Sequence, residues 1–109
     1  MKKGANTQEV AEKIAEIEDE MRRIGLWRDE PLREEQYEFR QAFAMDTMTL
    51  SQWLQFIFVP KVKAIIAAGG EFPGKSQVGA HALREFDAWN DAERLLGLLS
   101  EFDALFGAE

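Results

Sequence analysis

One segment of this chain constrains the fold more than any other: residues 47–60 carry no charge, although 30% of the chain is charged. The apolar side chains of this segment cover nearly every direction around a helical wheel. A helix that is apolar all round is buried on most sides. We therefore expect the segment to form a central, largely buried helix.

The start and the shape of this central helix can also be predicted. Thr49 and Gln52 have the spacing of a capping box, so the helix should begin near Leu50. Pro60 has no backbone N–H and clashes with the preceding turn. The proline should therefore kink the helix or split it in two.

Three further helices are expected around the central one. An apolar stripe with steps of three and four residues predicts a first helix that ends at Gly25. Its members are Val10, Ile14, Ile17, Met21 and Ile24. A short helix should span about residues 80–89, with Leu83 and Phe86 facing inward. The last helix should carry an inward face made of Leu95, Leu98, Leu99, Phe102, Leu105 and Phe106. We predict an all-α, four-helix bundle-like single domain over residues 1–109, with a proline-kinked central helix.

Two further capping pairs are expected at helix starts. Asn6 with Glu9 would begin the first helix, and Asn90 with Glu93 would begin the last. Residues 25–44 show no clean period and should form a structured connection.

Composition excludes several classes of function. Thirteen basic and twenty acidic residues give a net charge of -7, which disfavours direct binding to nucleic-acid phosphates. The chain has no cysteine, so disulfides and thiolate chemistry are excluded. Its longest uncharged segment is shorter than the roughly 20 residues of a membrane span. The acidic N-terminal region lacks the apolar core of a secretory signal. These features predict a soluble, cytoplasmic protein without a membrane partner.

One motif has the letters of a phosphate-binding loop. Residues 69–76, GGEFPGKS, match G-x-x-x-x-G-K-[ST]. The preceding residues continue a helical pattern, Pro73 removes a backbone donor, and Val78 with Gly79 makes a poor helix start. We expect an ordinary connection between helices here.

No set of residues indicates catalysis or metal binding. His81 is the one histidine, and with Glu85 it falls short of a metal-ligand set. The serines have no recognisable base beside them. We predict no cofactor, no metal and a non-enzymatic role.

Asp46 is the least explained charge, because it stands beside the apolar segment. Its carboxylate could cap the turn before the helix, anchor Arg40 or Lys61, or take part in binding. The binding alternative is a small-molecule pocket formed with Trp53 and Gln55.

The outer face of the first helix is strongly acidic. It carries Glu9, Glu12, Lys13, Glu16, Glu18, Asp19 and Glu20. Such a face is usually solvated, but Glu12, Glu16 and Asp19 could also bind a basic partner. The leading interpretation is a protein-interaction module that docks through this face or through an exposed apolar surface. A homodimer through a leftover apolar stripe stays open.

Several motifs together resemble the YqcC-like family. They are Met45-Asp46-Thr47-Met48, Trp53-Leu54-Gln55, Pro60, Pro73-Gly74, Asp103-Ala104-Leu105-Phe106 and the placement of Trp27. Members of that family are small bacterial proteins of unassigned function with an all-helical bundle fold, often encoded beside a tRNA pseudouridine synthase. The resemblance implies an accessory role near tRNA modification, with an RNA-modifying enzyme as the candidate partner. Lys75-Ser76 departs from the family pattern.

Overall fold

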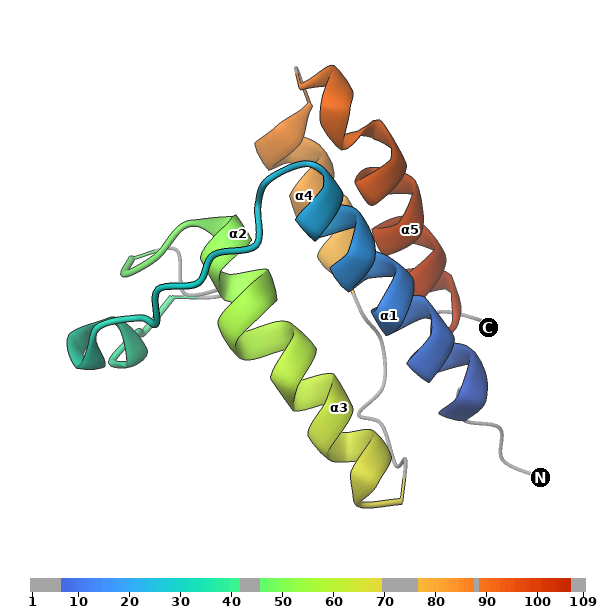
Figure 1. Ribbon diagram of the computed structural model, residues 1–109, viewed down its shortest axis with the longest axis horizontal. Helices are drawn as coiled ribbons and strands as arrows, with labels where there is room; N and C mark the ends of the chain where they lie inside the picture. Colours follow the sequence, from blue (N-terminus) through green and yellow to red (C-terminus); the bar gives the residue numbers. More distant parts are fainter. Residues whose placement is uncertain (1–6, 42–45, 70–76, 88, 107–109) are drawn as a thin grey trace.

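The computed structural model describes residues 7–41, 46–69, 77–87 and 89–106, and these residues form helices without any strand. The elements are α1 (Thr7–Arg23), the 3₁₀ turn η1 (Glu34–Tyr37), α2 (Leu50–Trp53), the π-helical turn η3 (Leu54–Phe58), α3 (Val59–Ala67), α4 (Val78–Phe86), the 3₁₀ turn η4 (Asn90–Ala92) and α5 (Glu93–Ala104). α2, η3 and α3 run on as one helix, so this part of the chain forms four helices (Figure 1). The predicted all-α, bundle-like fold is confirmed.

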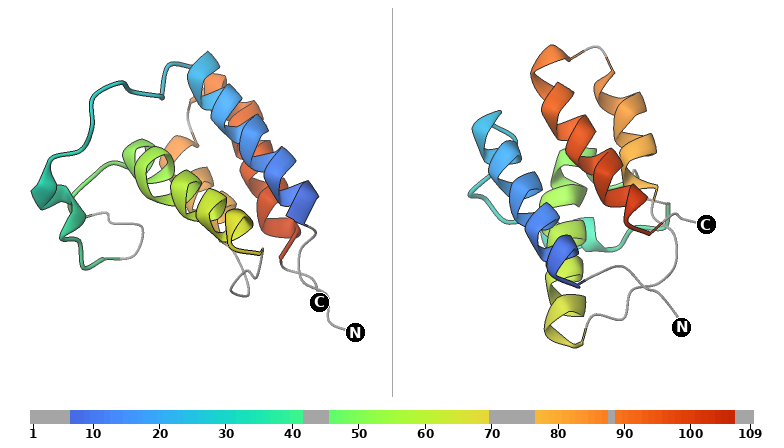
Figure 2. Two further views of the ribbon diagram at one scale, coloured as in Figure 1. Left: turned by 60° about the horizontal axis from the view of Figure 1, so that its bottom comes forward. Right: turned by 90° about the vertical axis from the view of Figure 1, so that its right-hand side faces the viewer.

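α1, α5 and α4 lie side by side, and the α2–α3 helix packs across this layer (Figure 2). α5 lies between α4 and α1, and the other side of α1 contacts α3 (Figures 1 and 2). The connection between α1 and α2 carries η1 and extends away from the helices as an arm (Figure 2). The α2–α3 helix therefore contributes one face to the shared core.

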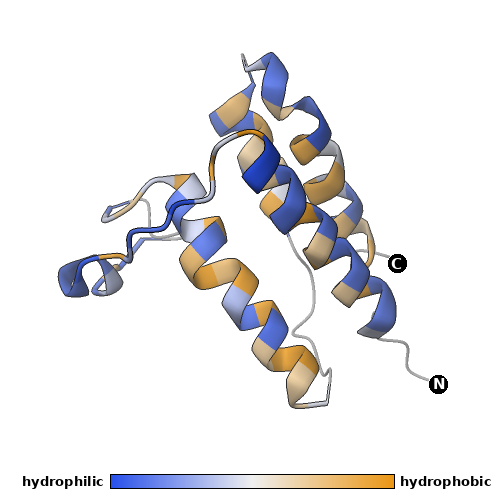
Figure 3. Ribbon diagram, in the orientation of Figure 1, coloured by the Kyte–Doolittle hydropathy of each residue, from blue (hydrophilic) through white to orange (hydrophobic). Residues whose placement is uncertain are grey.

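One hydrophobic core joins all four helices. It contains Val10, Ile14, Ile17, Met21, Leu50, Leu54, Phe58, Val59, Val62, Val78, Ala82, Leu95, Leu98, Leu99 and Phe102. Colouring by hydropathy shows that α1 alternates between apolar and strongly polar residues around its axis (Figure 3). An edge-to-face contact between Phe58 and Phe102, with ring centroids 5.0 Å apart, links the α2–α3 helix to α5. The apolar stripes predicted for the first and last helices are confirmed at their central positions.

The α2–α3 helix begins as predicted but is not split by its proline. The capping box is present: Thr49 Oγ1 accepts the Gln52 N–H at 3.2 Å, and Gln52 Oε1 accepts the Thr49 N–H at 3.0 Å. The π-helical turn ends two residues before Pro60, and the N–H of the next residue, Val59, donates to the Leu54 carbonyl. A π-turn widens the helix locally, so the proline ring fits without a break.

Burial of this helix is one-sided, in contrast to the expected burial on most sides. Phe56 and Ile57 are half-buried, and Pro60 and Ala64 are exposed. The reason is that α1 and α5 both pack against the same side of this helix. Part of its apolar surface therefore faces outward.

The predictions for α4 needed three corrections, the first being that the helix ends at Phe86 and not near residue 89. The helix begins at Val78, because its first N–H groups are held by a residue of α5: Asp103 Oδ1 accepts the Val78 N–H at 3.0 Å, and Oδ2 accepts the Gly79 N–H at 2.7 Å. Leu83 is 57% exposed, so its inward placement was wrong. Phe86 is half-buried against the core, as predicted.

The other helix ends agree in part with the predicted caps. Gly25 follows α1 with φ of 81°, the left-handed conformation expected of it. Asn90 opens η4, and α5 begins without a side-chain cap, so that capping prediction was wrong. Asn6 lies outside the described residues.

Candidate functional site: the acidic face of α1

The three acidic residues predicted to bind a partner lie together on α1. Glu12, Glu16 and Asp19 are exposed, on the side of the helix turned away from the core, and Glu9 shares this side. Residues spaced by three or four positions are neighbours on a helix surface. We call Glu9, Glu12, Glu16 and Asp19 the acidic face. Its local contacts include a hydrogen bond of 3.2 Å from Gln8 Nε2 to Glu12.

Two hollows extend the acidic face onto α5. The larger, of about 460 Å³, is lined by Lys13, Glu16, Glu93, Arg94, Gly97, Leu98 and Glu101. The smaller, of about 250 Å³, is lined by Glu9, Glu12, Lys13, Glu16 and Leu105. Together these linings hold five carboxylates and two cations. The groove between α1 and α5 therefore carries excess negative charge.

Lys13 ties the two helices together inside this groove. Its Nζ lies 2.6 Å from Glu101 Oε1 on α5 and 3.0 Å from Glu16 Oε1 on α1. The hydrogen bond to Glu101 raises the pKa of Lys13, and the same bond lowers the pKa of Glu101. Lys13 thus remains charged and fixes the geometry of the groove.

Glu20 is a buried member of the acidic run, contrary to the expected solvated position. Its side chain is 4% exposed and accepts hydrogen bonds from Arg23, one of them from Nε at 2.9 Å. Arg94 Nε, from the start of α5, lies 3.5 Å from the same carboxylate. The hydrogen bonding to Arg23 lowers the pKa of Glu20. Glu20 is therefore a structural link between α1 and α5.

Replacing Glu20 tests this link. We expect Glu20→Gln to lower the free energy of unfolding by about 1–2 kcal/mol at neutral pH, because a charged hydrogen-bond acceptor is lost while both arginines remain hydrated. The pKa of Glu20 is lower in the folded chain, so its contribution is present above the ordinary value of 4.5 and is lost as the pH falls through the lowered one. Urea unfolding at neutral and acidic pH should show the difference from wild type shrinking in acid. Asp19→Asn, a surface control, should stay within about 0.5 kcal/mol. A pH-independent difference for Glu20→Gln would contradict this role.

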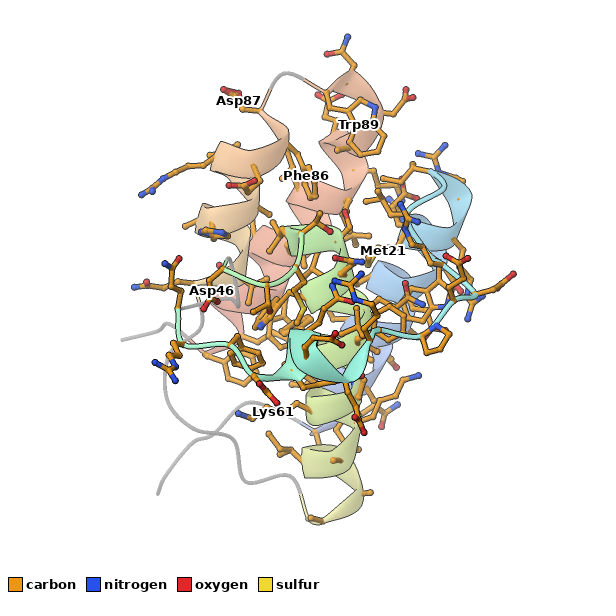
Figure 4. The ribbon with its side chains drawn as sticks, turned by 90° about the vertical axis from the view of Figure 1, so that its left-hand side faces the viewer. Met21, Asp46, Lys61, Phe86, Asp87 and Trp89 are labelled. Atoms are coloured by element: carbon orange, nitrogen blue, oxygen red, sulfur yellow. The ribbon has the colours of Figure 1, made fainter. Side chains whose placement is uncertain are left out.

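Asp46 holds the turn that ends the arm. Its carboxylate accepts the backbone N–H groups of Arg40 at 3.0 Å and of Gln41 at 3.4 Å. These hydrogen bonds, mainly the one from Arg40, lower the pKa of Asp46. Figure 4 places Asp46 in the arm, with Lys61 on α3 on the same side of the molecule. The predicted contact with Arg40 is thus present, made through the backbone N–H of that residue, and a binding role stays a prediction.

The other two residues of the predicted small-molecule pocket also have structural contacts. Gln55 is buried: its Oε1 accepts the Arg28 N–H at 2.8 Å, and its Nε2 donates to the Arg28 carbonyl at 2.7 Å. Trp53 stacks on Phe58 with ring centroids 5.5 Å apart. Gln55 therefore pins the arm to the helix, an assignment that no periodicity in the sequence signals. The hollows between α1 and α5 do not include Asp46, Trp53 or Gln55.

Two further features of the sequence were considered as candidate sites: the phosphate-loop match and a metal-ligand set. Residues 70–76, which complete the phosphate-loop match, are not described. Within residues 7–41, 46–69, 77–87 and 89–106, no group of three or more His, Cys, Asp or Glu could hold a metal. In that same part of the chain, no helix is both long enough and apolar enough to span a membrane.

The far end of the α4–α5 pair is closed by aromatic packing. Phe86 and Trp89 contact each other edge to face, with centroids 5.8 Å apart, whereas the Asp87 side chain points away from both rings (Figure 4).

These observations define a class: a small all-α domain with an acidic helix face. The chain belongs to the DUF446 family, whose model is described as tRNA pseudouridine synthase C and matches residues 9–105. This description differs from the YqcC-like name that the motifs suggested.

Two relatives place the chain further. A protein of Haemophilus influenzae named only as uncharacterized is 25% identical over 92 residues, covering 84% of this chain and 87% of the relative. The tRNA pseudouridine synthase C of Pectobacterium carotovorum is 31% identical over 58 residues, covering 53% of this chain but only 15% of that protein. No solved structure matches the chain. The similarity therefore spans nearly all of one small relative and a minor part of a much longer one.

Proposed function

We propose that this chain is a non-enzymatic accessory module that docks on a tRNA pseudouridine synthase. The observation that supports this is the Pectobacterium carotovorum protein, which is named for that activity and contains a segment similar to this chain. Linking two modules in one polypeptide raises their effective concentration. A module found linked to an enzyme in one organism is a reasonable partner for a separate enzyme in another.

An accessory role fits this chain better than synthase activity of its own. The similarity covers 15% of the Pectobacterium protein, so most of that protein has no counterpart in the matched segment. The net charge of -7 also opposes binding of tRNA, whose phosphates are bound by basic side chains. The module would therefore contact the enzyme rather than the RNA.

The acidic face of α1 is the surface that suits such a partner. An enzyme that acts on tRNA needs a basic surface for the phosphates. Complementary charge speeds association and selects the partner. The resemblance to the YqcC-like family implies the same partner, because genes of that family often lie beside a tRNA pseudouridine synthase gene. We also propose that the chain acts in the cytoplasm.

Reversing the charge of the acidic face tests the proposal. We expect the triple variant Glu12→Lys, Glu16→Lys, Asp19→Lys to bind the host's tRNA pseudouridine synthase at least about tenfold more weakly at low salt, because each lost charge pair contributes a few tenths to 1 kcal/mol and repulsion is added. Surface plasmon resonance at low and high salt gives the dissociation constants.

The matched control changes the same charge elsewhere. Glu34, Glu35 and Glu38 are exposed on the arm, and their reversal to lysine alters the net charge equally. At physiological salt we expect this variant to bind within about threefold of wild type, since exposed charges more than about 8 Å apart are largely screened there. Equal losses of affinity in both variants would show that net charge, and not the position of the acidic face, causes the weaker binding. Undiminished binding by the α1 variant would exclude the acidic face as the docking surface.

A further inference from the structure

We infer that the docking segment of the partner is both basic and apolar, and that it inserts an apolar side chain into a groove between α1 and α3. This inference rests on the proposed function and specifies the partner's chemistry. The groove has a volume of about 230 Å³ and is lined by Ala11, Ile14, Ala15, Glu18, Lys63 and Ile66.

The walls of the groove suit an apolar group. Ile14 forms the floor at 2% exposure, and half-buried Ile66 forms the α3 side. Ala11 and Ala15 stand one turn apart on α1, and their small side chains leave the space open. An apolar cavity of about 150 Å³ accepts benzene, so this groove is large enough for an aromatic or long aliphatic side chain.

An ion pair gives the groove a defined width. Glu18 on α1 and Lys63 on α3 approach to 3.0 Å, and Glu18 also pairs with Arg22 at 2.7 Å. The pair with Lys63 joins the two helices beside the groove, and both pairs compensate the charge of Glu18. The groove is thus a preformed apolar site with a neutralised rim.

The acidic face lies directly beside the groove, and this adjacency defines the occupant. Ala15 of the groove lining comes three residues after Glu12 and four residues before Asp19, so these carboxylates neighbour the groove on the helix surface. Glu16 in turn neighbours Glu12 and Asp19. A segment with its apolar side chain in the groove would bring flanking lysines or arginines onto these carboxylates. A second copy of this chain would instead bring a like-charged acidic protein to this surface.

A larger side chain in the α1–α3 groove tests how much the groove contributes to binding affinity independently of the acidic face. Ala15 is exposed, so Ala15→Leu should fold normally while its side chain occupies the groove. We expect this variant to bind the pseudouridine synthase at least about tenfold more weakly, as for a lost central anchor, and the loss should persist at high salt. Ala80→Leu, the same change at an exposed position of α4, should bind like wild type.

Isotope labelling gives a second readout. The methyl signals of Ile14 and Ile66 should shift when unlabelled synthase is added to the labelled chain. Wild-type affinity of Ala15→Leu would overturn the role of the α1–α3 groove in docking and leave the proposed function intact. Unshifted methyl signals in a complex that does form would have the same meaning. Absence of binding by the wild-type chain would overturn both.

Discussion

Gly79→Ala is expected to lower the free energy of unfolding by about 1–3 kcal/mol. A Cβ at this position would stand 2.8 Å from both Cα and N of Ser100, and 3.0 Å from the Asp103 carboxylate. The Ser100 atoms belong to the backbone of α5, so they cannot move aside without separating α4 from α5. Urea unfolding followed by circular dichroism measures the loss.

Gly97→Ala is the matched control, because the same methyl group is added within a helix of the same chain. Among the described residues, nothing beyond its chain neighbours and the backbone of its own helix lies within 4 Å of its Cβ position. Helix propensity should therefore dominate, and this variant should gain up to about 1 kcal/mol. Opposite signs for the two variants would confirm the close approach of α4 to α5, whereas equal destabilisation would contradict it.

Asp103→Ala is expected to cost about 1–3 kcal/mol of unfolding free energy. Its carboxylate accepts the N–H groups of Val78 and Gly79, two buried residues at the start of α4, and no side chain of Gln77 replaces it. Asp103→Asn keeps one acceptor oxygen and should lose less.

Hydrogen exchange distinguishes this cap from a general loss of stability. In Asp103→Ala, the exchange rates of the Val78 and Gly79 amides should rise above their wild-type values. This rise should exceed the one that global unfolding causes at the other described amides of α4 and α5. Asp19→Ala removes an exposed carboxylate and should change stability by no more than about 0.5 kcal/mol. Unchanged exchange at Val78 and Gly79 would show that Asp103 is not their cap.

Features set by neighbouring residues were predictable from the sequence. The apolar stripe of α1, the left-handed Gly25 and the Thr49–Gln52 capping box all depend on residues within a few positions of one another. The helix period places the acidic face opposite the core, so the exposure of Glu12, Glu16 and Asp19 followed from the same pattern.

Features set by distant partners were not predictable. The start of α4 depends on Asp103, which is 25 residues from Val78. The burial of Glu20 depends on how α5 places Arg94 beside it. The sequence signal that was available for the groove is the pair Ala11 and Ala15, small residues one turn apart, but its depth depends on where α3 lies.

The measurement that tests the central claim most directly is a titration of the purified wild-type chain with the host's tRNA pseudouridine synthase by isothermal calorimetry at low and high salt. The proposal predicts a stoichiometric complex whose affinity falls as salt rises, since the acidic face contributes to it. No detectable complex at low salt would contradict the account of this chain as a docking module for that enzyme.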